Sequence, residues 1–266
     1  MKVAVIGLGW VGKSMVQLFP DAVVYDEPMI DEGMEKEQAS IVKEEGRIQV
    51  GLCDVAFVCV PTPNNDKAEL DTSIVEEVVR WCDAPLIVIR STVNPGTCDR
   101  LAKETGKRIV MQPEYLGETP NHPMLDPTTR QFMVIGGASE DRRTLINLYQ
   151  EVYNANVNIK QVTALEAEVI KLTENRAIAF KVGQCQELYD ACENAGIDYY
   201  TVRDAVYGED PRFNLWFTFI YPEKRGFNSK CIPKDVYAWK AWAESSGINP
   251  ELTTALLKTN DRLING

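Results

Sequence analysis

Short continuous apolar runs recur along the first 155 residues of the chain. They lie at residues 2–6, 22–25, 55–60, 85–89, 108–111 and 132–135. Runs of this kind are typical of strands that are buried on both faces of a parallel sheet. Stretches in which apolar residues recur every three or four positions alternate with these runs and predict amphipathic helices. These stretches lie at residues 10–19, 35–45, 72–82 and 97–105.

The alternation of strands and helices predicts an α/β fold with a doubly wound, Rossmann-type parallel sheet in a domain spanning residues 1–160. The pattern then changes. Residues 163–194 contain no proline and, apart from Gly183, no residue that breaks helices, while apolar residues recur at helical spacing from Leu165 to Cys192. We therefore expect one long helix that opens an all-helical domain, residues 161–266. Its shorter helical patterns lie at residues 199–207, 234–246 and 250–264.

Charge and composition exclude some functions. The 266 residues include 28 Lys and Arg against 39 Asp and Glu, a net charge of −11. Because binding to a phosphate backbone needs a basic face, we expect no nucleic-acid partner. No apolar run approaches the ~20 residues of a membrane-spanning helix, and the N-terminus lacks the features of an export signal. We expect a cytoplasmic protein that neither binds nor spans a membrane.

The cysteines and the histidine argue against a metal site. The chain has seven cysteines, none of them in a Cys-x-x-Cys pair, and His122 is its only histidine. Zinc sites are usually built from such pairs together with histidines, so we expect no metal. Reduced thiols in a cytosolic protein fit this pattern best.

A glycine motif follows the first predicted strand and opens the first predicted helix. In the sequence GLGWVG, Gly7 permits a tight turn, Gly9 lets the backbone approach a pyrophosphate, and Gly12 lets the helix pack closely. Asp26 ends the second strand nineteen residues after Gly7, where a carboxylate can bind both ribose hydroxyls of adenosine. With Glu27 beside it, this acid favours NAD over NADP. The alternative is a glycine turn that only packs a helix on a strand.

Polar residues also follow the third, fourth and fifth predicted strands, where open parallel sheets bind ligands. Pro61 and Thr62 follow the third strand and Thr92 the fourth, and each loop could equally be a turn with a capping hydroxyl. After the fifth strand, the sequence PEYLGE places Glu114 and Glu118 four residues apart. Here a solvated acidic loop is the alternative.

Two further groups of residues lie in the helical half. Lys171 and Asn175 are four residues apart on one face of the long helix and could donate hydrogen bonds to a developing oxyanion. Alternatively, they form a half-exposed flank in which Lys171 pairs with Glu168 or Glu174. In GFNSKCIPKD, Cys231 lies where a helix begins, and the helix dipole with Lys230 and Lys234 favours a thiolate. A buried cysteine at a helix start is the alternative.

Taken together, these motifs resemble the UDP-glucose/GDP-mannose dehydrogenase family nearly end to end. The motifs are GLGWVG, YD at 25–26, CVPTP, STVNPGT, PEYLGE, EAEVIKLTEN and GFNSKCIPKD. The resemblance implies that the chain oxidises the primary alcohol of a nucleotide sugar, UDP-glucose first among the candidates, to a carboxylate. It also implies two NAD per sugar, one enzyme cysteine, and a homodimer built through the long helix.

The resemblance implies a role for each matching residue. The residues expected to bind NAD are Gly7, Gly9, Trp10, Val11, Gly12, Asp26, Pro61, Thr62, Thr92, Glu118 and Lys234. The residues expected to contact the substrate are Glu114, Tyr115, Leu116, Lys171, Asn175, Gly226, Phe227 and Cys231. The catalytic residues are expected to be Cys231, Lys171, Asn175, Asp235, Glu114 and Thr92. Among them Cys231 is the nucleophile, Lys171 and Asn175 stabilise an oxyanion, and Asp235 and Glu114 orient or deprotonate water.

Two departures from the family pattern keep other functions open. The family usually has glycines just before the cysteine, where this chain has Asn228, Ser229 and Lys230. The chain also ends at Gly266, where the family continues into a second Rossmann-like domain. One alternative is a β-hydroxyacid-type dehydrogenase, which transfers one hydride and needs no cysteine. Another is a non-catalytic protein that binds NAD.

Overall fold

The computed structural model describes residues 1–117, 126–153 and 156–265. The chain divides into two compact units. Unit 1 comprises Met1–Asn65 and Leu70–Lys171, and unit 2 comprises Asp66–Glu69 and Leu172–Gly266. Helix α7 (Ala164–Ala195) contributes its first eight residues to unit 1 and the rest to unit 2. The domain boundary expected after residue 160 stays a prediction.

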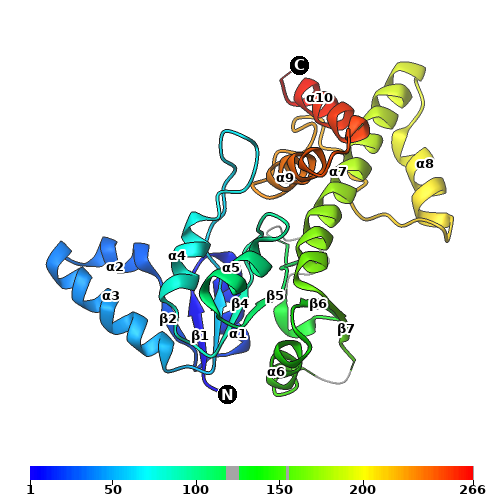
Figure 1. Cartoon of the computed structure of the whole chain (residues 1–266). Helices are drawn as coiled ribbons and strands as arrows, with labels where there is room; N and C mark the ends of the chain where they lie inside the picture. The colour runs from blue at the N-terminus through cyan, green and yellow to red at the C-terminus, as the bar shows by residue number, and fades with distance from the viewer. Residues whose placement is uncertain (118–125, 154–155, 266) are drawn as a thin grey trace. The chain divides into compact units, whose positions relative to one another are not determined.

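Unit 1 contains a seven-stranded sheet with the strand order β2-β1-β3-β4-β5-β6-β7 (Figure 1). Six of its strands coincide with the apolar runs in the sequence. They are β1 (Val3–Ile6), β2 (Val23–Tyr25), β3 (Val55–Val58), β4 (Leu86–Ile89), β5 (Ile109–Met111) and β6 (Phe132–Gly136). The seventh strand, β7 (Asn158–Val162), was not predicted, because it is a half-exposed edge strand without a continuous apolar run.

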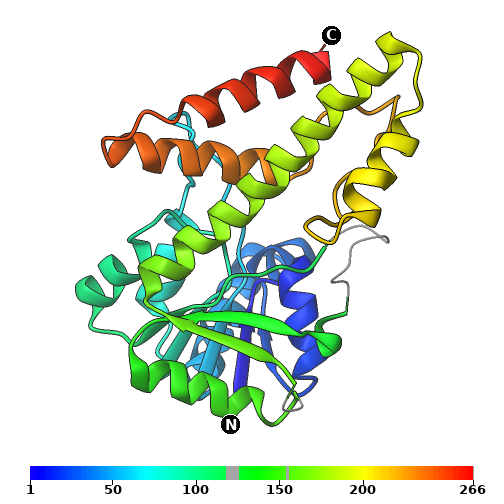
Figure 2. The same cartoon turned by 90° about the vertical axis from the view of Figure 1, so that its right-hand side faces the viewer.

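The sheet is mostly parallel. Strands β1 to β5 run in one direction, whereas β6 pairs antiparallel with β5 and parallel with β7, which lies beside it in green in Figure 2. The strand ends are in register, since Ile6 pairs with Val58, Val58 with Ile89, and Ile89 with Met111. The carboxyl ends of β1, β3, β4 and β5 therefore lie along one edge of the sheet, where its loops can share a site.

Alternate side chains of the strands enter two separate apolar layers. Val3 and Val5 pack with residues of α1 and α6, whereas Ala4 and Ile6 pack with residues of α3, α4 and α5. Helices therefore cover both faces of the sheet, which confirms the doubly wound fold. The bounds of these helices are α1 (Trp10–Leu18), α3 (Lys36–Gly51), α4 (Ser73–Trp81), α5 (Thr97–Thr105) and α6 (Ser139–Tyr149).

Two short helices of unit 1 have no apolar periodicity that would predict them. Helix α2 (Glu27–Gly33) has no buried residue, and Asp26 caps its first turn. A single 3-10 turn, Pro127–Thr129, precedes β6. Both depend on local capping: Asp26 accepts a hydrogen bond from the Met29 N–H, and Asp126 accepts one from the Thr128 N–H.

The described part of unit 2 is helical, as predicted. After α7 come α8 (Tyr199–Arg203), α9 (Ile232–Ser245) and α10 (Glu251–Asn265). The helix expected over residues 199–207 is split, because α8 continues into a π-helical segment, Asp204–Glu209. Two apolar clusters pack in this unit. One contains Ala179, Phe227, Val236, Leu256 and Leu257, and the other contains Cys185, Cys192, Tyr199, Tyr207 and Ile220.

Among the described residues, none of the helices combines the length and the apolar character that crossing a lipid bilayer requires.

Candidate active site

The three glycines of the β1–α1 turn have different surroundings. A Cβ at Gly7, which has a φ of +88°, would lie 2.7 Å from the carbonyl oxygen of Cys59, at the end of β3. A Cβ at Gly12 would lie 1.9 Å from the carbonyl oxygen of Gly7, whereas a Cβ at Gly9 would meet no atom within 4 Å. Gly7 and Gly12 are therefore required for packing, and Gly9 leaves the backbone open to a ligand.

Asp26 links the glycine turn to α2. Its Oδ2 accepts a hydrogen bond from the Leu8 N–H at 2.6 Å, and its Oδ1 accepts one from the Met29 N–H at 3.0 Å. A carboxylate has further lone pairs, so the half-buried Asp26 can still accept a ribose hydroxyl. Glu27 contacts the Lys43 ammonium at 2.8 Å. Its charge is therefore partly neutralised.

The loops after β3 and β4 are joined by side-chain hydroxyls. Thr62 is buried, and its Oγ1 donates to the carbonyl oxygen of Thr92 at 2.7 Å. Ser91 Oγ donates to the carbonyl oxygen of Val60 at 2.6 Å. The Thr62 hydroxyl thus stabilises the loop pair, and Pro61 next to it is exposed. Trp10 and Val11, which begin α1, are exposed and half-buried, respectively.

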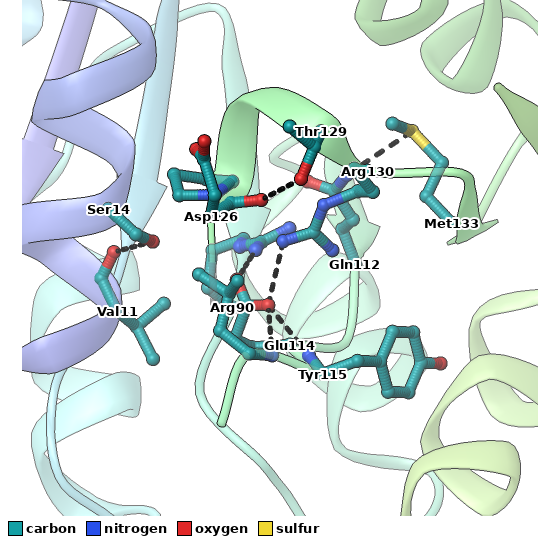
Figure 3. A network of polar contacts seen from close by, with 12 residues as sticks. Val11, Ser14, Arg90, Gln112, Glu114, Tyr115, Asp126, Thr129, Arg130 and Met133 are labelled. Carbon is teal, nitrogen blue, oxygen red and sulfur yellow. Dashed lines mark hydrogen bonds and ion pairs between the residues drawn. The ribbon is translucent and has the colours of Figure 1, made fainter. Parts of the chain in front are cut away.

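Glu114 lies in a buried network of polar contacts (Figure 3). Its carboxylate forms ion pairs with Arg90 at the end of β4 and with Arg130, the residue after the 3-10 turn. It also accepts the backbone N–H groups of Tyr115 at 2.7 Å and Leu116 at 2.8 Å. With an exposed fraction of 6%, Glu114 is almost inaccessible to solvent. The carboxylate therefore holds the backbone of the PEYLGE loop in place.

These contacts decide the charge of Glu114. Burial alone would raise the pKa of its carboxyl group, but the charges of Arg90 and Arg130 and the backbone N–H groups lower this pKa to about 2. A carboxylate with so low a pKa is a weak base. The geometry therefore favours a positioning role for Glu114 over the proton transfer expected from the sequence. Glu118, the second acid of the motif, lies outside the described residues, as does His122.

Sequence reasoning did not identify the two arginine partners of Glu114. Arg90 has an exposed fraction of 2%, and within the described ranges its Nε and Nη1 have no hydrogen-bond partner. One feature of the sequence points to it: a charged residue follows four buried apolar residues of β4, and a buried charge requires a counter-ion. Which acid supplies that counter-ion depends on the tertiary structure.

Lys171 and Tyr115 are in contact in unit 1. The Lys171 Nζ lies 5.4 Å from the centroid of the Tyr115 ring, which stacks on Phe132 at 5.1 Å. Glu168, one suggested partner of Lys171, instead accepts the N–H groups of Gly96 at 2.5 Å and Cys98 at 2.8 Å. That alternative is wrong for Glu168. Its carboxylate joins α7 to the first turn of α5, and burial raises its pKa.

Unit 2 contains a second polar group around Asp235. The Asp235 side chain, with an exposed fraction of 1%, accepts a hydrogen bond from Asn175 Nδ2 at 2.5 Å and contacts Lys234 Nζ at 2.7 Å. Its backbone N–H donates to the carbonyl oxygen of Cys231 at 3.0 Å in the first turn of α9. The residues predicted from two separate motifs, Asn175 on α7 and Asp235 on α9, are thus brought together.

Cys231 differs from the other six cysteines. It is exposed at the N-cap position of α9, whereas Cys53, Cys59, Cys82, Cys98, Cys185 and Cys192 are buried. Burial raises the pKa of the Cys59 thiol to about 12 and that of the Cys98 thiol well above its usual range. Accessibility and position thus make Cys231 the best candidate for a nucleophile.

Known proteins are similar to this chain over both of its units. The model of the NAD binding domain of the UDP-glucose/GDP-mannose dehydrogenase family matches residues 20–157, and the model of the central domain of that family matches residues 165–262. UDP-glucose 6-dehydrogenase AglM of Haloferax volcanii is 30% identical, covering 78% of this chain and 52% of that protein. The UDP-glucose 6-dehydrogenase of Streptococcus pneumoniae is 28% identical, and the match covers 98% of this chain and 73% of that protein.

A solved structure is also similar. The UDP-glucose dehydrogenase of Pyrobaculum islandicum matches with a TM-score of 0.80 and 25% sequence identity, over 98% of this chain and 68% of that one. Several curated relatives are longer, and the chain spans about half their length.

Proposed function

Because this chain belongs to the UDP-glucose/GDP-mannose dehydrogenase family, we propose that it oxidises the primary alcohol of a nucleotide sugar to a carboxylate, with UDP-glucose as the leading candidate substrate. The observation that carries this proposal is the exposed Cys231 at the start of α9, in the same unit as the Asn175–Asp235 pair. A dehydrogenase that transfers a single hydride has no use for such a thiol.

NAD is the cofactor, since residues 20–157 match the NAD-binding domain of the family. The residues present fit this group, because Gly9 leaves open space beside the first turn of α1 and Asp26 directly follows β2. Gly7, Gly9, Gly12 and Trp10 would hold the pyrophosphate, and Asp26 the adenosine ribose. When bound, NAD accepts a hydride from the substrate carbon in each of the two oxidations.

Cys231 supplies the covalent chemistry between the two oxidations. Its thiolate sulfur bonds to the aldehyde carbon, and the carbonyl oxygen becomes the oxyanion of a thiohemiacetal. Loss of a hydride from that carbon produces a thioester. Water then adds to the thioester carbon, and the carbon–sulfur bond breaks to release the carboxylate and the thiol.

The remaining polar residues stabilise the oxyanion, activate water or position the substrate loop. Lys171 and Asn175 donate hydrogen bonds to the oxyanion, and Asp235, held by Asn175, orients and deprotonates water. Thr92, whose carbonyl oxygen accepts the Thr62 hydroxyl, is the further catalytic residue proposed from unit 1. Glu114 positions Tyr115 and Leu116 at the substrate rather than exchanging a proton.

Three further residues complete the proposed site. Gly226 and the backbone of Phe227 adjoin the sugar subsite, whereas the Phe227 ring, expected from the sequence to contact the substrate, is buried in an apolar cluster of unit 2. Lys234, whose ammonium contacts Asp235 at 2.7 Å, contributes to cofactor binding.

The yield of NADH tests the proposed function. Purified protein incubated with excess NAD and a limiting amount of UDP-glucose should produce two NADH per sugar, because the alcohol and the aldehyde are each oxidised once. UDP-N-acetylmannosamine and GDP-mannose serve as comparison substrates. One NADH per sugar would favour a single-step dehydrogenase instead. Binding of NAD by calorimetry without any NADH from these sugars would indicate a non-catalytic protein.

We also propose a homodimer through α7. Several apolar side chains of this helix are only partly buried within a single chain: Val182 and Leu188 pack in part against the apolar clusters of unit 2, and Ile178 belongs to neither cluster. Sedimentation equilibrium should give twice the chain mass of 29.9 kDa. Replacing Ile178 by aspartate should shift the mass toward the monomer, because a charge cannot be buried unpaired at an apolar interface. A wild-type monomer at all concentrations would contradict this proposal.

A further inference from the structure

One buried amide binds both backbone polar groups of a residue in the loop before Cys231. Asn260, on α10, has an exposed fraction of 4%. Its Oδ1 accepts a hydrogen bond from the Phe227 N–H at 2.7 Å, and its Nδ2 donates to the Phe227 carbonyl oxygen at 3.1 Å. Phe227 lies in an irregular segment outside any helix, so these bonds replace the partners that regular secondary structure would provide.

The residues on both sides of this contact are also constrained. Gly226 has a φ of +72°, and a Cβ there would lie 2.6 Å from Asn260 Oδ1. The Phe227 ring is buried in an apolar cluster with Val236 of α9 and Leu256 of α10. The Gly226–Phe227 segment therefore cannot shift without breaking the amide contact or opening the core of unit 2.

A second contact holds the chain closer to the thiol. Ser229 Oγ accepts a hydrogen bond from the Ile232 N–H at 3.1 Å, in the first turn of α9. The loop is thus held at Phe227 and at Ser229, which lie four and two residues before Cys231. The glycines typical of the family are absent here, because Asn228, Ser229 and Lys230 take their place. Fixed contacts at both points restrict where the thiol can lie relative to α9.

We propose that Asn260 is a positioning residue for Cys231. By holding the Phe227 backbone, its amide fixes the path of the loop and thereby the place of the thiol at the start of α9. This inference rests on the proposed function, in which Cys231 is the nucleophile. A misplaced nucleophile slows the covalent step much more than it weakens binding of the nucleotide sugar.

The test compares Asn260→Leu with Thr253→Val. Thr253 lies on the same helix and is fully buried, but its hydroxyl contacts Arg176 rather than the loop. For Asn260→Leu we expect hydrogen exchange of the Phe227 amide to accelerate about tenfold or more. We also expect kcat to fall about tenfold or more, with a much smaller change in KM. Thr253→Val should leave the exchange rate of the Phe227 amide unchanged. It should lower kcat less than about twofold, because the Thr253 hydroxyl does not contact the loop and the two sites act independently.

Several outcomes would overturn the proposal. Equal losses of kcat in the two variants would indicate general destabilisation of α10, and an unchanged kcat in Asn260→Leu would show that the contact does not position the thiol. If Asn260→Leu fails to fold, Asn260→Gln, which keeps the amide but moves it by one methylene, is measured in the same way and should show the same changes to a smaller extent.

The same variants separate this inference from the proposed function. If the wild-type protein reduces no NAD with any nucleotide sugar, the proposed function fails. The rate at which iodoacetamide alkylates Cys231 still tests the positioning role. Asn260→Leu should change this rate more than about threefold, because the thiol leaves its place at the helix N-terminus, whereas Thr253→Val should not. Equal alkylation rates in all three proteins would refute the inference.

Discussion

Replacing Cys231 by serine is expected to stop the reaction after its first oxidation. A serine hydroxyl is almost entirely protonated at neutral pH and is a far weaker nucleophile than a thiolate, so the aldehyde is not captured. We expect the rate of carboxylate formation to fall about 10³-fold or more, as is typical when a nucleophile is removed. The yield should fall from two NADH to at most one per sugar, measured by absorbance with limiting UDP-glucose.

Two controls show that the effect of Cys231→Ser is local. A thiol reagent should label one site rapidly in the native wild-type protein and none in the variant, because the other six cysteines are buried. NAD affinity measured by calorimetry should not change, since the substitution leaves the glycine turn, Asp26 and Lys234 intact. A variant that still produces the carboxylate at the wild-type rate would refute the thioester mechanism.

Replacing Glu114 by glutamine is expected to destabilise the fold strongly. The substitution leaves Arg90 and Arg130, both buried, without their counter-ion, and breaking a buried ion pair typically costs about 3–5 kcal/mol. Urea unfolding at pH 7 should show this loss in the free energy of unfolding. Glu104→Gln is the matched control: Glu104 also pairs with an arginine, Arg100, but at the surface. The control should lose less than about 0.5 kcal/mol.

The effect of Glu114→Gln should depend on pH. The pKa of Glu114 is lowered from 4.5 to about 2 in the folded protein, so its ionised form stabilises the fold above pH 4.5. The contribution, about 3 kcal/mol at neutral pH, is lost as the pH falls from 4.5 toward 2. The difference in unfolding free energy between wild type and variant should therefore shrink over this range. Loss of turnover with unchanged stability would instead indicate that Glu114 acts as a base.

The sequence predicted most of the secondary structure, because burial imposes periodic patterns. Continuous apolar runs marked the strands that are buried on both faces, and the 32-residue helix α7 was predicted to within a residue at each end. Helix α6 was not predicted, although it buries Leu145, Leu148 and Tyr149. Two elements with little buried surface were missed as well. Helix α2 has no buried residue, and β7 is a half-exposed edge strand. Neither carries the periodicity on which such predictions depend.

The antiparallel pairing of β6 with β5 also escaped prediction. The apolar run at residues 132–135 is compatible with a buried strand in either direction, so composition does not specify the orientation of β6. Direction is decided by the path of the connecting chain, which is a property of the whole fold.

In the candidate site, the sequence identified residue types and their spacing along the chain. It determined that glycines form the β1–α1 turn, that an acid ends β2, that Lys171 and Asn175 share a helix face, and that a cysteine begins α9. These features are local, since turns, helix faces and caps depend on neighbouring residues.

Only the tertiary structure decided which side chains act together. It paired Glu114 with two arginines, whose charges lower the pKa of its carboxyl group, and it paired Asn175 with Asp235 sixty residues away. It also left Cys231 exposed while burying the other six cysteines. The charge state and the accessibility of a side chain depend on partners and burial brought together by folding, which no local pattern records.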